Sequence, residues 1–206
     1  MTEASLWDSS DKVKLSWEEY FDIPLPWHKV YSLLYRISID SNSRMFQYKL
    51  LFKFLPCNKT LCLWGLIDSP ICSLCKEEEE SVVHLFWNCH ITANFWALVD
   101  DWFFNITDIH LHINARNIIF GNLSDRCPIL SNVIVLLGKM FIFKSRKHSL
   151  SLPSFISYVS YFYKLEYNIA YRQGKLQKHR GKWGNLGTYF DNIELIMIGF
   201  SATIDC

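Results

Sequence analysis

The chain has 206 residues, of which 50% are hydrophobic and 16% aromatic, and its formal net charge is +1. This composition excludes a disordered protein and predicts a packed core built largely from aromatic rings. No uninterrupted apolar run reaches the ~18 residues of a membrane-spanning helix. The acidic, polar start MTEASLWDSSDKVK does not look like a signal peptide. We therefore expect an intracellular protein, nuclear or cytoplasmic and without a membrane partner, whose seven cysteines are thiols or metal ligands.

The small net charge hides an uneven distribution along the chain. Residues 1–30 hold six acids and three lysines, whereas residues 139–182 hold ten lysines and arginines and a single acid, Glu166. A net charge of +9 over the second segment favours contact with a polyanion.

Two amphipathic segments open the chain after its proline-rich stretch FDIPLPW. WHKVYSLLYRISID places apolar residues at helical spacing from Trp27 to Ile37. A second helix is expected in RMFQYKLLFKFLP, with Ser41 or Ser43 as the N-cap and Pro56 as the terminator.

The segment SVVHLFWNCHITANFWALVDDWFFN, from Ser81 onward, predicts a helix of more than twenty residues. His84 and Cys89 lie five apart in it, a spacing that does not suit one face of an α-helix. We therefore expect the helix to be irregular near Asn88, or His84 to precede its regular part.

The remaining elements have weaker or longer patterns. Residues 106–128 are expected to form a loop or short strand. Two long helices follow, in SNVIVLLGKMFIFKSRKH and in PSFISYVSYFYKLEYNIAYRQGK, the second starting at Pro153 and stopping at Gly174. The final stretch IELIMIGFSATIDC is expected to be a strand or a disordered tail.

Three cysteines and a histidine lie close together in CSLCKEEEESVVHLFWNC, with the spacing Cys-x2-Cys-x8-His-x4-Cys. A Cys-x2-Cys turn brings two thiolates to one ion, and a following pair closes a tetrahedral shell. The predicted ligands are Cys72, Cys75, His84 and Cys89. Three thiolates and one imidazole leave no open position for water, so the pattern predicts one structural zinc ion and not a catalytic one.

Two alternatives stay open at this site. The cysteines and His84 could be buried by chance as ordinary core residues, and His90 could replace His84 as the nitrogen ligand. The glutamate run at residues 77–80 makes the loop surface negative, which disfavours phosphate contact there, and we interpret it as a solvated loop.

The segment RMFQYKLLFKFLPCNKTLCLWGLIDSPICSLCKEEEESVVHLFWNCHITANFW resembles the reverse-transcriptase zinc-binding domain. In non-LTR (LINE-type) retrotransposon proteins that domain follows the polymerase. The shared features are the FQYKLL helix, the approach to the first cysteine pair, the acidic loop, the HLFW.C pair and the trailing FW. The basic segments ILSNVIVLLGKMFIFKSRK and LEYNIAYRQGKLQKHRGKW are also similar to the tails of such elements, so the resemblance spans roughly residues 27–183.

The resemblance implies the same four zinc ligands and a role in handling template RNA and target DNA. It does not bring a polymerase or a nuclease with it. Asp100 and Asp101 superficially look like the paired aspartates of a polymerase, but two-metal catalysis needs a third carboxylate and a hairpin to present the pair. We therefore expect no enzymatic activity, no small-molecule substrate and a chain that represents the end of a longer reading frame, or a truncated remnant of one.

The expected fold is mainly α, with a small helical zinc-binding domain of the Cys-Cys-His-Cys type followed by a two-helix basic C-terminal region. The expected divisions are an N-terminal extension at 1–26, the zinc-binding domain at 27–104, a connecting segment at 105–130, the basic helical region at 131–183 and a tail at 184–206.

The favoured function is non-specific or weakly specific binding of RNA or DNA through this basic region, with Trp183 stacking on unpaired bases. The predicted contacts are Lys144, Arg146, Lys147, Arg172, Lys175, Lys178, Arg180, Lys182 and Trp183. The sequence KLQKHRGKW contains no acid to pair with these cations. The alternative is a structural module whose aromatic helices pack against an upstream polymerase domain, with the cations forming a solvated face.

Overall fold

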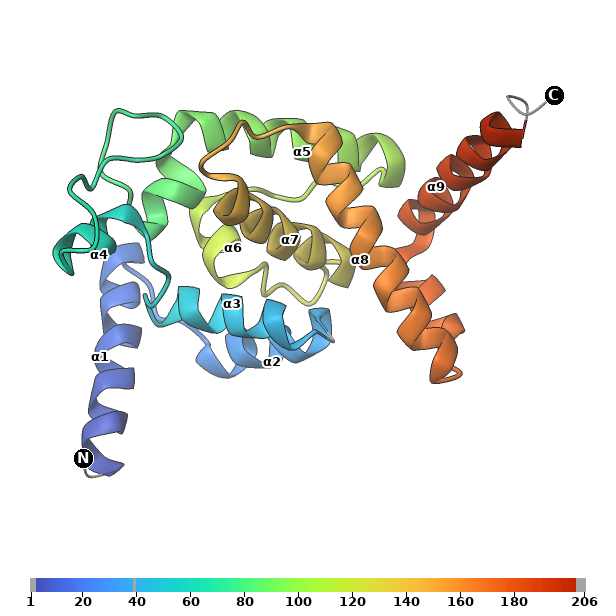
Figure 1. Cartoon of the computed structure of the whole chain (residues 1–206). Helices are drawn as coiled ribbons and strands as arrows, with labels where there is room; N and C mark the ends of the chain where they lie inside the picture. The colour runs from blue at the N-terminus through green and yellow to red at the C-terminus, as the bar shows by residue number, and fades with distance from the viewer. Residues whose placement is uncertain (1–2, 39, 203–206) are drawn as a thin grey trace.

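A computed structural model describes the backbone of residues 3–38 and 40–202 and the side chains of residues 11–38 and 40–192. Helices dominate this part of the chain, and it contains no β-strand, so the prediction of a mainly α fold is confirmed (Figure 1). The elements are α1 (Glu3–Phe21), α2 (Trp27–Ile37), α3 (Ser41–Leu51), α4 (Asn58–Leu63), the π-helical turn η1 (His84–Asn88), α5 (His90–Thr107), α6 (Ala115–Phe120), α7 (Ile129–Ser145), α8 (Leu152–Arg172) and α9 (Leu176–Ala202). None of the described helices is both long and apolar enough to cross a membrane.

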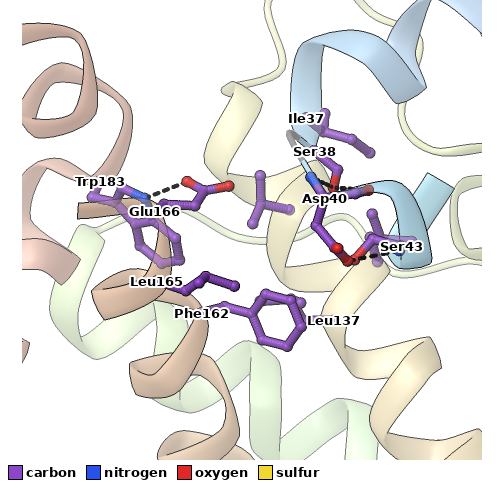
Figure 2. Close-up of a pocket in the computed structure, with 11 residues that line it drawn as sticks. Ile37, Ser38, Asp40, Ser43, Leu137, Phe162, Leu165, Glu166 and Trp183 are labelled. Carbon is purple, nitrogen blue, oxygen red and sulfur yellow. Dashed lines mark hydrogen bonds between the residues drawn. The ribbon is translucent and has the colours of Figure 1, made fainter. Parts of the chain in front are cut away.

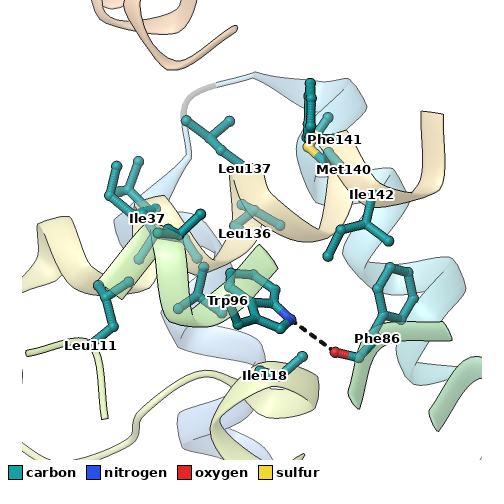
Figure 3. Close-up of a cluster of buried hydrophobic side chains, with 14 of the residues drawn as sticks. Ile37, Phe86, Trp96, Leu111, Ile118, Leu136, Leu137, Met140, Phe141 and Ile142 are labelled. Carbon is teal, nitrogen blue, oxygen red and sulfur yellow. Dashed lines mark hydrogen bonds between the residues drawn. The ribbon is translucent and has the colours of Figure 1, made fainter. Parts of the chain in front are cut away.

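Helix α7 lies at the centre of the molecule, with the other helices arranged around it (Figure 1). Every residue from Leu130 to Ile142 is buried, as expected for a helix that is apolar on all sides. At Gly138 a Cβ atom would lie only 2.4 Å from Cη2 of Trp96, so glycine allows α5 to approach α7 closely. The Trp96 indole N–H donates to the Phe86 carbonyl oxygen at 2.9 Å, which ties α5 to η1 within this core (Figure 3).

The start of α3 differs from the prediction. The N-cap is Asp40 and not Ser41 or Ser43. Its carboxylate accepts the backbone N–H groups of Asn42 and Ser43, together with the hydroxyl of Ser43. Partial burial opposes ionisation of Asp40, but these hydrogen bonds outweigh it and lower the pKa of the carboxyl. An aspartate at this position also suits the positive end of the helix dipole.

The segment joining the two halves of the chain is largely loop, as expected, but it also contains the short helix α6. Asn114 caps it by accepting the backbone N–H of Asn117 at 2.9 Å. Ile118, Ile119 and Phe120 are buried, so packing against the core stabilises a helix that is too short to persist alone.

Helices α8 and α9 form a hairpin whose turn includes Gly174, with φ at +65°. Glu166 of α8 is buried and accepts hydrogen bonds from the Lys182 ammonium and the Trp183 indole N–H of α9. A cavity of about 10 Å³ lies beside this pair, enough for roughly one water molecule, so it is not a ligand site (Figure 2).

The C-terminal stretch was predicted to be a strand or a disordered tail, and this was wrong for residues up to Ala202. Helix α9 continues to that residue, with a break at Gly184 (φ +45°). Leu186 and Phe190, one helical turn apart, are both buried, and this apolar face packs the first turns after Gly184 against the rest of the fold. Residues 203–206 lie outside the described part of the chain.

Candidate metal centre

The four cysteine and histidine side chains singled out by their spacing meet at one point. The ligand atoms of Cys72, Cys75, His84 and Cys89 all lie within 4.8 Å of one another, and Sγ of Cys75 is 3.4 Å from Nε2 of His84. Cys72, His84 and Cys89 are buried and Cys75 is partly exposed. The centre therefore sits at the edge of the core, closed on its inner side by protein.

The first two ligands are carried by a tight turn. The backbone N–H of Cys72 donates to the Glu78 carbonyl at 2.7 Å, and the N–H of Lys76 donates to the Cys72 carbonyl at 3.1 Å. An isolated β-bridge between Ile71 and Glu79 closes the base of this turn. Lys76 has φ at +63°, which reverses the chain immediately after Cys75.

The second pair is brought together by the π-helical turn η1. The backbone N–H of Cys89 donates to the His84 carbonyl at 2.9 Å, so the five-residue interval between the two ligands forms one hydrogen-bonded turn. A regular α-helix would not place residues five apart on one face. The predicted irregularity near Asn88 is thus confirmed, and Cys89 serves as the boundary residue before α5 begins at His90.

A carboxylate behind the histidine orients the imidazole. Oε2 of Glu78 lies 3.1 Å from Nδ1 of His84, while Nε2 faces the sulfur of Cys75. A proton on Nδ1, donated to the carboxylate, leaves the Nε2 lone pair free for a metal. The glutamate run therefore includes a residue that supports the ligand set.

The two thiols of the first turn differ in acidity. Burial raises the pKa of Cys72 to about 12. Slight burial also opposes ionisation of Cys75, but backbone N–H groups of Glu78 and Glu77 outweigh it and lower the pKa of this thiol to about 6. The backbone donors that face this sulfur are those that stabilise a metal-bound thiolate.

His90, the alternative nitrogen ligand, is not part of the cluster. Its side chain is 54% exposed, and its Nδ1 atom lies 3.5 Å from Oε2 of Glu77. The structure thus brings His84, and not His90, to the three thiols. The remaining described cysteines, Cys57, Cys62 and Cys127, are free thiols outside the centre.

Glu80 contradicts the interpretation of the glutamate run as a solvated loop. It is completely buried, and its carboxylate accepts the backbone N–H groups of Asn58 and Ser73 and one N–H of the Arg146 guanidinium, each at 3.0 Å. Arg146 also donates to the Pro56 carbonyl at 2.9 Å. This ion pair fastens the turn that carries Cys72 and Cys75 to the end of α7. No local sequence pattern separates Glu80 from the exposed glutamates beside it.

The donor set fits zinc. Tetrahedral binding with Zn–S distances of about 2.3 Å separates the ligand atoms by about 3.8 Å, which is compatible with the observed cluster. Three sulfurs and one imidazole nitrogen are the soft and borderline donors that zinc prefers, and an orienting carboxylate is in place.

The predicted nucleic-acid contacts do not form one patch. Six of them are exposed and fall into two groups, one at the end of α7 and one at the α8–α9 turn. The first group is Lys144 and Lys147, and the second is Arg172, Lys175, Lys178 and Arg180. Helix α8, with 21 residues and a length of about 30 Å, separates the two groups (Figure 1).

Three other predicted contacts are used inside the protein. Arg146 pairs with Glu80, and Lys182 lies 2.8 Å from the carboxylate of Glu166. Trp183 is fully buried, so the expectation that its ring stacks on a base is wrong for this fold. The sequence pattern does not reveal Glu166 as the partner of Lys182 and Trp183, because Glu166 lies on the preceding helix, α8.

Asp100 also has a structural role. Its carboxylate accepts the backbone N–H of Leu111 at 2.6 Å and lies 2.8 Å from Nδ1 of His110, so it fastens the segment that follows α5. Asp101 next to it is exposed on the same helix.

Residues 12–96 match the model of a family described as zinc-binding in reverse transcriptase. All four residues of the centre lie within this span, together with helices α2 to α4. The matched segment begins before the expected start of the zinc-binding domain at residue 27. No curated protein matches the chain.

Proposed function

Because residues 12–96 are a reverse-transcriptase zinc-binding domain, we propose that the chain is a zinc-stabilised module that binds single-stranded RNA or DNA. The observation that carries this proposal is the meeting of four soft and borderline ligand atoms inside the matched segment. In this proposal the module derives from the C-terminal end of a non-LTR retrotransposon reverse transcriptase and has no polymerase or nuclease activity of its own.

One zinc ion has a structural role in this proposal. Its four ligands are Cys72, Cys75, His84 and Cys89. A structural zinc ion is four-coordinate, so its shell has no position for water or substrate. The ion would join the turn at residues 72–75 to the start of α5. Binding energy at such a site is folding energy.

The nucleic-acid contact is proposed at the α8–α9 turn. Arg172, Lys175, Lys178 and Arg180 are all exposed there, and the sequence has no acid between Glu166 and Asp191. Glu166 is already engaged by Lys182, so it does not neutralise these four cations. Four phosphate contacts to a single strand correspond to a slope of log K against log salt near −3.

The metal half of the proposal is tested by counting zinc in protein purified without chelator. We expect one zinc per chain in the parent and in the control Cys62→Ser, and loss of both zinc and helical signal in Cys72→Ser. A parent chain without zinc, or a Cys72→Ser variant with full zinc content, would contradict the proposal.

The nucleic-acid half is tested by fluorescence anisotropy with labelled single-stranded RNA and DNA over a range of salt concentrations. Replacing Lys175 and Lys178 by glutamine should weaken binding and reduce the steepness of the salt dependence by about 1.4, because two phosphate contacts are lost. The control Lys76→Gln, in the acidic metal loop, should bind as the parent does. No binding at low salt would exclude the function.

A second function is favoured by an apolar surface beside the metal centre. Leu63, Trp64 and Leu66, at the end of α4 and just after it, are 78%, 58% and 65% exposed. Such a cluster suits a protein contact, for example with an upstream polymerase domain. Failure to bind nucleic acid, together with self-association of the chain that Trp64→Ala abolishes, would favour this function.

A further inference from the structure

Five aromatic side chains lie on α2, on α3 and in the residues just after α3. We call them the aromatic ladder. They are Tyr31, Tyr35, Tyr48, Phe52 and Phe54. Tyr31 and Tyr35 are one turn apart on α2, and Tyr48 is one turn before Phe52 at the end of α3. The two helices contact each other (Figure 1), and the rings of Tyr31 and Phe52 meet between them.

Four of the five ring planes in the ladder are close to parallel. Phe52 is its centre: the ring centroids of Tyr31, Tyr48 and Phe54 lie 6.4, 4.4 and 6.3 Å from that of Phe52, at interplanar angles of 17°, 30° and 22°. The outer rings are open to solvent, with Tyr35 at 71%, Phe54 at 57% and Tyr48 at 44% exposure. Exposed, near-parallel rings of this kind can be extended by further flat rings that stack on them.

Cations are interleaved with these rings. The Arg44 guanidinium lies 5.1 Å from the centre of the Tyr35 ring, and Lys49 and Lys53 are exposed on either side of Phe52 in the sequence. The Lys53 ammonium donates a hydrogen bond to the Ser16 hydroxyl at 2.7 Å, which holds this side chain in place. A surface for an apolar protein partner is depleted in lysine, whereas rings alternating with cations suit a chain of bases and phosphates.

A polar cavity of about 100 Å³ opens on the neighbouring side of α2. Lys29, Ser32 and Arg36 line it from α2, and Ser124 and Asp125 line it from the loop before α7. Lys29 lies 3.7 Å from Asp125, whose side chain is 87% exposed. Ser32 and Arg36 directly follow the two tyrosines in the sequence, so the cavity offers hydroxyl and guanidinium donors close to the ladder.

The ladder also adjoins the basic turn. The Lys182 ammonium donates to the Ile37 carbonyl at 3.0 Å, which fixes α9 against the C-terminal end of α2. This end carries Tyr35 and Arg36. A strand bound at the α8–α9 turn can therefore continue onto α2 without crossing an acidic surface such as the metal loop.

From these observations we infer that the aromatic ladder is a stacking platform for unpaired bases of a single-stranded nucleic acid, with Arg36, Arg44 and Lys49 facing its phosphates. The inference rests on the proposed function and adds a second contact surface to it. Single-stranded RNA and DNA share the chemistry that the ladder recognises, and paired bases do not, because their faces are already stacked.

The test compares Tyr35→Ala and Phe54→Ala with the control Tyr161→Ala, an equally exposed tyrosine on α8. All three rings are largely outside the core, so the variants should fold as the parent does, which circular dichroism and zinc content verify. Each is titrated with labelled oligouridine, oligothymidine and a duplex of the same length.

Both ladder variants should bind the two single strands about tenfold more weakly than the parent and the control. Their salt dependence should be unchanged, because no phosphate contact is removed, whereas Lys49→Gln should reduce its steepness by about 0.7. A preference between oligouridine and oligothymidine identifies the strand. Binding to the duplex should be weak and unaffected by either ring.

Parent-like affinity of both ladder variants for single strands would overturn the inference while leaving the proposed function intact. An equal loss of duplex binding would also overturn it, because the rings would then act without stacking. Absence of binding by the parent at low salt would instead refute the proposed function, and the inference with it.

Discussion

Lys139 provides a sharp test of the fold. The sequence counts it among the cations of the basic region, but the structure buries it in the middle of α7, at 2% exposure. Its ammonium group donates a hydrogen bond to Oε1 of Gln47, and Nε2 of Gln47 donates in turn to the Ile119 carbonyl. Burial without an acidic partner lowers the pKa of Lys139 to about 7.

The size of the effect follows from that pKa. The unfolded chain has the ordinary lysine pKa of 10.5, so charging Lys139 in the fold costs about 5 kcal/mol at pH values below 7. Replacing it by methionine removes this cost and keeps the length of the side chain. It also leaves Oε1 of Gln47 without its donor, which costs about 1–2 kcal/mol. Lys139→Met should therefore stabilise the protein by about 3 kcal/mol at about pH 6.5.

The stability of the parent should change with pH in a direction that the two pKa values of Lys139 determine. Between pH 7 and 10.5 the unfolded chain binds more protons at this lysine than the native chain does, so the stability of the parent rises with pH over this window and is independent of this group below it. At about pH 9 the parent has recovered about 3 kcal/mol, and the advantage of Lys139→Met should nearly vanish.

Urea unfolding of parent and variant at both pH values measures this difference, and contributions from the thiols cancel between the two proteins. The control Lys49→Met, on the exposed face of α3, should change stability little at either pH. If Lys139→Met had the same effect at both pH values, the buried lysine would not titrate in this range, and the reasoning would be wrong.

Three further predictions concern the metal loop and the central helix. Glu80→Gln should destabilise the protein by about 3–5 kcal/mol in urea unfolding, because it leaves the largely buried Arg146 guanidinium without its charged partner, whereas Glu79→Gln, which removes an exposed ion pair, should cost less than about 1 kcal/mol. Equal effects of the two would contradict the burial of Glu80. Gly138→Ala should cost about 1–3 kcal/mol through its clash with Trp96, and Gly181→Ala, where nothing lies within 4 Å of the added carbon, should be neutral or stabilising. Excess EDTA should lower the thermal midpoint of the parent, and zinc should restore it; a midpoint that ignores the chelator would argue against structural zinc.

The features that the sequence predicts well depend on neighbours along the chain. The spacing of Cys72, Cys75, His84 and Cys89 requires a short turn and a compact second pair, and both are local. The mismatch between a five-residue interval and an α-helix face pointed to the irregular turn before α5 for the same reason. Apolar periodicity likewise located most of the long helices.

The features that it misses depend on contacts between distant segments. Glu80 and Arg146 are 66 residues apart, and Lys139 and Gln47 are 92 apart. From residue type alone, Glu80, Arg146 and Lys139 are all expected at the surface, since charged side chains are rarely buried without a partner. Trp183 was misplaced in the same way, because its partner Glu166 belongs to the preceding helix.

One of these distant contacts connects the local metal site to the rest of the molecule. Glu80 accepts the backbone N–H of Ser73, which lies between the first two ligands of the centre, and it also binds Arg146 at the end of α7. The carboxylate of Glu80 holds the turn at residues 72–75 from one side, and the proposed zinc ion would hold it from the other. Helix α7 is the element on which α2 and α3 pack. A zinc ion bound at the edge of the core, as proposed, would therefore help to fix the end of the helix on which α2 and α3 pack.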